Sequence, residues 1–188
     1  MPLTTYTAGE VLTAASLNAN FSFAAANPPG GLTLISATTI GSAVSTVGLT
    51  NIFSTTYDAY KIFIAGGVGS GTNQEFNVNL TGSTASYYNT VIYASYGAGS
   101  ASVIGANNGA AWTYLGWVNT TTLSLNLDLV NPFLAKPTTM QSQITRSDIG
   151  GIVNGIHNVS TSYTGLTLAP SSGTITGGTV YVYGYAKA

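Results

Sequence analysis

Few side chains in this chain of 188 residues are suited to acid–base or nucleophilic chemistry. The only histidine, His157, lies in an alternating run that puts Val153 and Val159 on its own side. That setting favours an imidazole packed in the core over a general base. Ser160 and Ser162 follow, but positions three and five residues along a strand lie roughly 10 to 16 Å away. A nucleophile–base pair is therefore not expected along this run.

Carboxylates are also sparse. Cleavage of a glycosidic bond needs two of them about 5 to 10 Å apart, and the chain offers only Glu10, Asp58, Glu75, Asp128 and Asp148. They are scattered, without the spacing of a calcium loop. Cysteine is absent, which excludes a thiolate metal site and disulfides. We therefore expect a protein that is not an enzyme and that holds no metal and no cofactor.

Binding of nucleic acid or of a nucleotide has equally little support. Four basic residues against five acidic ones cannot form a nucleic-acid footprint. The glycine-rich stretch at residues 66–71 is not followed by Gly-Lys-Ser/Thr or by a helical pattern, which a phosphate loop requires. This stretch predicts a flexible hairpin loop.

Aromatic residues are better candidates for recognition. Tyr181, Tyr183 and Tyr185 alternate with small or aliphatic residues, so three phenols share one face of a predicted strand. Such a stripe suits a subunit interface or sugar stacking. The alternative is a core strand whose hydroxyls reach the rim of the sheet.

A second aromatic group flanks the segment 94–111, which is rich in small residues and reads as a long loop. Long loops on a rigid scaffold commonly carry recognition. We place a ligand contact here, with sugars stacking on aromatic rings and amides bonding to hydroxyls: Tyr96, Asn107, Asn108 and Trp112. The alternative for Trp112 is that it begins a buried strand with Tyr114.

The composition points to an unusual surface. Apolar residues make up 45% of the chain, which excludes simple disorder, yet only 5% are charged, against roughly 25% in ordinary soluble domains. Solubility must come from neutral polar groups, which suits a protein working outside a cell. The N-terminus lacks the pattern of a secretory signal, and no run approaches the roughly 18 apolar residues of a membrane span. No membrane insertion is expected.

Strand-like runs separated by turn residues fill the chain after residue 31. Leu123, Leu125, Leu127 and Leu129 alternate with polar residues, the period-two pattern of a strand with one face on a core. These runs predict an all-β fold, an antiparallel β-sandwich or jelly-roll-like domain: 32–37, 47–53, 59–65, 76–80, 88–94, 111–118, 122–130, 139–148, 152–159, 166–169 and 174–185.

One short helix is expected before this domain. Thr13 suits an N-cap, Leu17 and Phe21 recur at helical spacing with Ala24 and Ala25, and Asn27-Pro28-Pro29 ends the pattern. A helix of about a dozen residues is marginal alone in water, so its apolar face needs a partner. The sequence leaves open whether that partner is the chain's own β domain or another copy. We predict two units, an attachment and oligomerisation helix with its linker at 1–31 and a β-sandwich at 32–188.

The helical segment carries a resemblance. Gly9-Glu10-Val11-Leu12-Thr13-Ala14-Ala15-Ser16-Leu17-Asn18, preceded by Tyr6 and followed by Phe21, is similar to the start of many fibre and appendage proteins of tailed bacteriophages. Three later stretches resemble landmarks of a β domain in fibre-like proteins of these phages: 53–62, 131–139 and 178–185. The resemblance implies an oligomeric, often trimeric, structural protein.

From this resemblance we expect a non-enzymatic virion protein, made in the host cytoplasm and released by lysis. The role we favour is a homotrimeric tail fibre or spike component. Its N-terminal segment would bind other virion proteins, and its β domain would contact the host surface, such as a glycan receptor. The first alternative is a head fibre or a capsid decoration protein. A tailspike that depolymerises glycans is the least favoured alternative. Leu17, Phe21, Tyr181, Tyr183 and Tyr185 are the expected interface residues.

Overall fold

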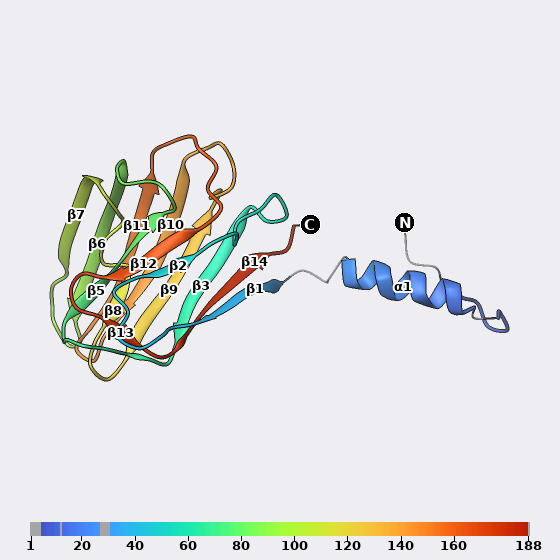
Figure 1. Ribbon diagram of the computed structural model, residues 1–188, viewed down its shortest axis with the longest axis horizontal. Coiled ribbons are helices and arrows are strands. Elements are labelled where there is room, and N and C mark those ends of the chain that lie inside the picture. Colours follow the sequence, from blue (N-terminus) through green and yellow to red (C-terminus); the bar gives the residue numbers. More distant parts are fainter. Residues whose placement is uncertain (1–4, 12, 27–30, 188) are drawn as a thin grey trace.

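A computed structural model describes residues 5–11, 13–26 and 31–187 as an antiparallel β-sandwich preceded by one helix (Figure 1). This confirms the predicted fold class. Helix α1 (Ala14–Ala26) begins where Thr13 caps it. The Thr13 hydroxyl oxygen accepts a hydrogen bond from the backbone N–H of Ser16 at 3.2 Å, which satisfies a free donor of the first turn. The predicted linker lies largely outside the described residues.

Eight strands form the larger layer of the sandwich, in the spatial order β1-β14-β3-β9-β10-β11-β6-β7, and each pairs antiparallel with its neighbours. Their bounds are β1 (Leu32–Thr39), β3 (Ala59–Ala65), β6 (Tyr87–Ser95), β7 (Ser102–Gly109), β9 (Leu123–Val130), β10 (Thr138–Thr145), β11 (Ile149–His157) and β14 (Thr179–Tyr185).

Four strands form the second layer, in the order β2-β12-β5-β8. They are β2 (Val47–Leu49), β5 (Gln74–Leu80), β8 (Gly116–Val118) and β12 (Leu166–Pro170). The strands β4 (Val68–Gly69) and β13 (Ile175–Thr176) form a separate two-stranded sheet. Strand β9 joins the layers, because its first residues pair with β8 while residues 126–130 pair with β3.

The core lies between the two layers and is made by every second residue of the strands. In β9 the four predicted leucines are buried, whereas Ser124, Asn126 and Asp128 are only half-buried on the opposite face. We call the side of the larger layer that faces away from the core its outer face. The same alternation buries Val180 and Val182 of β14 and leaves its tyrosines on the outer face.

Two predictions about loops are wrong. The segment 94–111 contains strand β7, which pairs with β6 from Ser102 to Gly109, so backbone pairing orders its small polar residues. The glycine-rich stretch at 66–71 contains β4, which pairs with β13. Conversely, most of the predicted strand at 111–118 is irregular, with only a bridge from Trp112 to Val78 before β8 begins.

Candidate functional site

The imidazole of His157 lies in the core. It is fully buried and stacks on Tyr87 with 4.3 Å between ring centroids. Its Nδ1 lies 3.2 Å from the carbonyl oxygen of Ser86, which can only accept, so the ring proton is on Nδ1. Nε2 then accepts from the hydroxyl of Tyr163 at 2.7 Å. Burial lowers the pKa of His157, which favours the neutral ring.

Ser83 also contacts this histidine, and sequence reasoning missed it. Its hydroxyl oxygen lies 3.2 Å from Nε2, although the two residues are 74 positions apart. The distance resembles that of a nucleophile and its base, but His157 has no exposed surface, which leaves a substrate no access to the ring. The contact therefore satisfies buried polar atoms.

Three aspartates form ion pairs, each with a different cation. Asp128 lies 2.7 Å from Lys61 Nζ, Asp58 lies 2.8 Å from Lys187 Nζ, and Asp148 contacts Arg146. The described residues contain no group of three His, Cys, Asp or Glu side chains arranged to hold a metal ion. In the same part of the chain no helix is long and apolar enough to cross a membrane.

The predicted ligand contact does not form one site. Tyr96 is 60% exposed just beyond β6, whereas Asn107 and Asn108 lie at the far end of β7, roughly 25 Å away along the hairpin at about 3.3 Å per residue. The Asn108 side chain accepts a hydrogen bond from the Ser86 N–H, so it braces the backbone.

Trp112 is a core residue, which is the alternative to a ligand contact that the sequence left open. It is fully buried and packs edge-on against Tyr87, so it cannot touch a receptor directly. Its Nε1 has no hydrogen-bond partner among the described residues. As a ligand contact, the prediction for Trp112 is wrong.

The three C-terminal tyrosines belong to an apolar surface that we call the outer patch. The Phe63 ring stacks with Tyr181 and Tyr183, with centroids 5.3 and 5.8 Å apart. Strand β1 adds Leu32 and Leu34, which lie opposite Tyr185 and Tyr183 and are 49% and 52% exposed. The outer patch thus comprises Leu32, Leu34, Phe63, Tyr181, Tyr183 and Tyr185. The alternative that the tyrosines face the core is wrong, because Val180 and Val182 occupy those positions.

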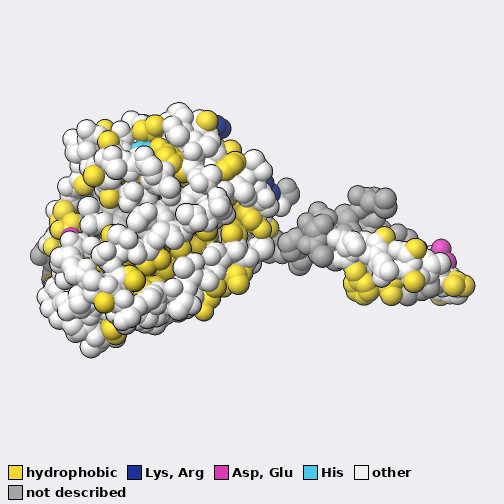
Figure 2. All heavy atoms as spheres, viewed as in Figure 1, with side chains coloured by type: hydrophobic (Ala, Val, Ile, Leu, Met, Phe, Trp, Pro, Cys, Tyr) yellow, Lys and Arg dark blue, Asp and Glu magenta, His cyan; other side chains and the backbone are white. Residues whose placement is uncertain are grey.

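Helix α1 lies apart from the β domain (Figure 1). Phe21 is 65% exposed and Leu17 is half-buried. The apolar residues of the helix are less confined to one face than the sequence predicted. Figure 2 shows apolar side chains on the visible side of the helix and only scattered charged ones on the visible surface.

The outer face also carries two shallow grooves, of about 380 and 370 Å³, that share Asn154 and Gly155. Tyr88 and Thr90 line the first, and Asp128 and Gln141 line the second. These grooves lie over β9, β10, β11 and β6, beyond the outer patch. Next to them Ile152, Ile92 and Val103 lie side by side on β11, β6 and β7 and are exposed.

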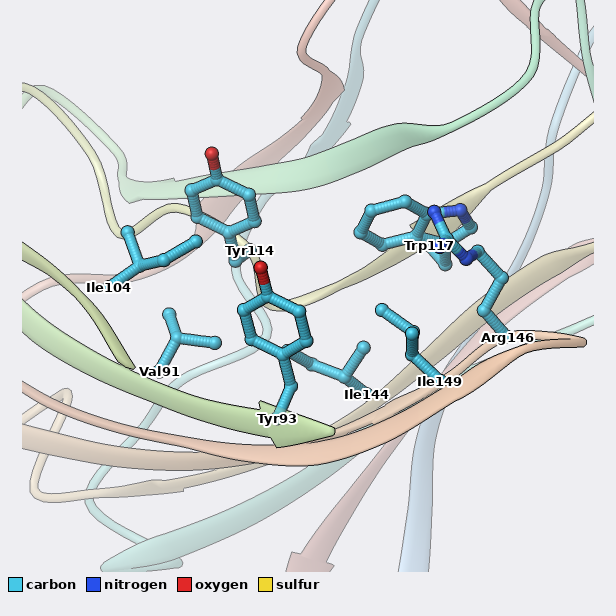
Figure 3. A pocket seen from close by; sticks show the side chains of 8 residues that line it. All are labelled: Val91, Tyr93, Ile104, Tyr114, Trp117, Ile144, Arg146 and Ile149. Carbon is cyan, nitrogen blue, oxygen red and sulfur yellow. The ribbon is translucent and has the colours of Figure 1, made fainter. Parts of the chain in front are cut away.

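A more enclosed cavity of about 100 Å³ lies between the layers, and we call it the sandwich cavity (Figure 3). Buried aliphatic side chains form its floor, and half-buried aromatic residues stand at its rim. In Figure 3 the hydroxyls of Tyr93 and Tyr114 point the same way. The lining residues are Val91, Tyr93, Ile104, Tyr114, Trp117, Ile144, Arg146 and Ile149.

Two features of the rim are unusual. Tyr114 has a φ of 61°, a left-handed conformation that costs a bulky residue about 1 to 3 kcal/mol. Arg146 lies 4.6 Å above the Trp117 ring, and Asp148 and Asn73 hold its guanidinium there. The Trp117 Nε1 is buried and has no hydrogen-bond partner among the described residues. Sequence reasoning missed this cavity, because its residues come from four separate segments of the chain, at 91–93, 104, 114–117 and 144–149.

Comparisons with known proteins add no relative. A scan against protein-family models found no match, and searches of the curated proteins and of the solved structures found none either.

Proposed function

We propose that the protein is a non-enzymatic structural component of a tailed-bacteriophage virion, a homotrimeric fibre or spike part. The N-terminal segment attaches it to other virion proteins, and the β domain contacts the host surface. The observation that carries this proposal is that apolar surfaces are left uncovered, among them helix α1 with its exposed Phe21 and the outer patch with Leu32 and Leu34. Exposed apolar patches commonly mark sites of association.

The small number of charges supports the same proposal. With 5% charged residues and no disulfide, the chain gains most stability by burying surface between copies. The resemblance of residues 9–21 to phage appendage proteins supplies the biological setting. A catalytic role has less support, since the only imidazole is buried and three of the carboxylates are engaged in ion pairs.

Labelling the protein on intact particles tests the proposal. The chain lacks cysteine, so a Thr120→Cys variant, at an exposed turn, accepts one maleimide-gold label per copy. Electron microscopy should show the label on the tail. The cysteine-free parent is the control and should take no label. Label on the head would favour the role of a head fibre or capsid decoration protein. If no label is found on the particles, the virion proposal is refuted.

The attachment role of the helix is tested separately. Leu17→Asp combined with Phe21→Asp should abolish incorporation into particles, because burying charge in an apolar contact costs several kcal/mol. The β domain should keep its melting temperature. Asn18→Asp, an exposed position on the same helix, is the matched control. Normal incorporation of the double variant would move the attachment surface to the β domain.

A further inference from the structure

The size of the sandwich cavity limits what it can hold. An engineered apolar cavity of about 150 Å³ takes up benzene, and this one measures about 100 Å³. A whole hexose ring is therefore too large, whereas a methyl or acetyl group fits. The floor residues Val91, Ile144 and Ile149 are buried and aliphatic, which favours an apolar group at the deep end.

Polar groups at the rim favour a ligand in which a polar group is bonded next to that apolar group. The hydroxyls of Tyr93 and Tyr114 point the same way (Figure 3), and the buried Trp117 Nε1 has no partner in the described part of the chain. Burial raises the pKa of Tyr114, so its hydroxyl stays protonated and able to donate. The two tyrosine hydroxyls at the rim can donate to an acceptor such as an amide carbonyl, whereas Trp117 Nε1 has no exposed surface and takes no part in the contact.

An anionic ligand is a poor match for the rim, because the rim has little net positive charge. Arg146 is the only cation of the lining, and Asp148 already binds its guanidinium, as does the Asn73 side chain. The ion pair leaves little net charge for a carboxylate or phosphate. A neutral group therefore suits the cavity.

From size, polarity and charge together, we propose that the sandwich cavity binds the acetamido group of an N-acetylated sugar, with the methyl on the aliphatic floor and the sugar ring at the aromatic rim. Sugar rings stack on Tyr and Trp faces, and Tyr93, Ile104 and Tyr114 are only half-buried, so the cavity opens on their side. This inference rests on the proposed function, since it names the host-surface chemistry that the β domain would contact.

The test is a titration of the full-length protein, labelled with ¹³C at the isoleucine δ1 methyls, with N-acetylglucosamine and with glucose. The two sugars differ in the acetamido group. The methyl signals of Ile104, Ile144 and Ile149 should shift with N-acetylglucosamine and not with glucose. The Ile152 methyl, 41% exposed on the outer face, should remain unchanged.

Matched variants locate the binding. Ile104→Trp fills the cavity from the rim and should remove the response, whereas Val103→Trp, at the neighbouring position that is 68% exposed, should retain it. Tyr114→Phe keeps the ring, removes one hydroxyl and should weaken binding about fivefold, as expected for one hydrogen bond. This milder variant keeps the test decisive if Ile104→Trp fails to fold.

Three outcomes would overturn the inference: no methyl shift with N-acetylglucosamine, equal shifts with glucose, or shifts that follow protein concentration without sugar. The last would assign the cavity to a side chain of another copy. Particle labelling does not involve the cavity, so the two proposals fail separately. Labelled particles with no sugar response would refute only the acetamido site, and a sugar response in a protein absent from particles would refute only the virion role.

Discussion

The two aromatic clusters of the β domain arise from the same alternation but meet different surroundings. Around His157, the rings of Tyr87, Trp112 and Tyr163 are buried, and the tyrosine hydroxyls bond to Leu80 N–H and to the imidazole. In the outer patch, Phe63 stacks with two tyrosines, yet the leucines of the neighbouring strand β1 remain exposed. Alternation determines which face a side chain takes, but not what covers that face.

The largest expected difference between the clusters is in stability. Trp112→Ala should lower the free energy of unfolding by about 3 to 5 kcal/mol, because it leaves a large cavity in a packed core. Tyr183→Ala, in the outer patch, should cost about 1 kcal/mol or less within a single chain. Urea denaturation at several protein concentrations measures both. Equal losses would mean that the outer patch is part of the folding core.

The next difference is in association. Tyr181→Asp with Tyr183→Asp should leave the domain folded but dissociate the proposed trimer, since an interface does not tolerate unpaired buried charge. Light scattering should give three times the chain mass of 19.2 kDa for the parent and one chain mass for the variant. Gln143→Asp, exposed on the same sheet face, is the control. A monomeric parent protein would contradict the trimer.

Strand periodicity predicted most of the fold from the sequence. Strand β3 was expected at 59–65 and observed as Ala59–Ala65, because both its faces are largely apolar and its ends carry turn residues. Strand β7 was missed, since Gly105, Ala106 and Asn107 have low strand propensity. Pairing with β6 in a hairpin orders them, and the composition of the segment alone does not show that pairing.

The candidate sites were less predictable than the strands. The Ser83–His157 contact and the sandwich cavity join residues from distant segments, and only the register of the sheets brings them together. Trp112 was ambiguous because an aromatic residue near a polar segment fits both a core and a binding surface. The tyrosines of β14 were correctly predicted to share a face, but the covering of that face depends on other molecules.

A smaller effect concerns pH and the buried cluster. Burial lowers the pKa of His157 below its ordinary value of 6.5, so the unfolded chain binds a proton more readily than the folded one. The free energy of unfolding should therefore be highest above pH 6.5 and decrease as the pH falls below it. His157 is the only histidine, and carboxylates titrate near 4. The free energy of unfolding, measured by denaturation at about pH 7.5 and at about pH 5.5 on either side of the histidine pKa, should show this decrease. His157→Gln should remove it.

The smallest expected effect is in the outer patch, at the hydrogen bond from the Tyr185 hydroxyl to Asp128. That bond, 2.7 Å long, raises the pKa of Tyr185 from 10.0 to about 12. A tyrosine NMR titration should find Tyr185 largely neutral near pH 11, halfway between those two values. In Asp128→Asn its pKa should move back toward 10.0, because the carboxylate that opposes the phenolate is gone. The same substitution removes the charge partner of Lys61, so the stability change near pH 7 should be about 1 kcal/mol, at the upper end for partly exposed pairs. If the Tyr185 titration is unchanged in Asp128→Asn, packing within the outer patch, rather than the carboxylate, keeps the phenol neutral. The outer patch would then resemble the buried cluster around His157 more closely than its exposure indicates.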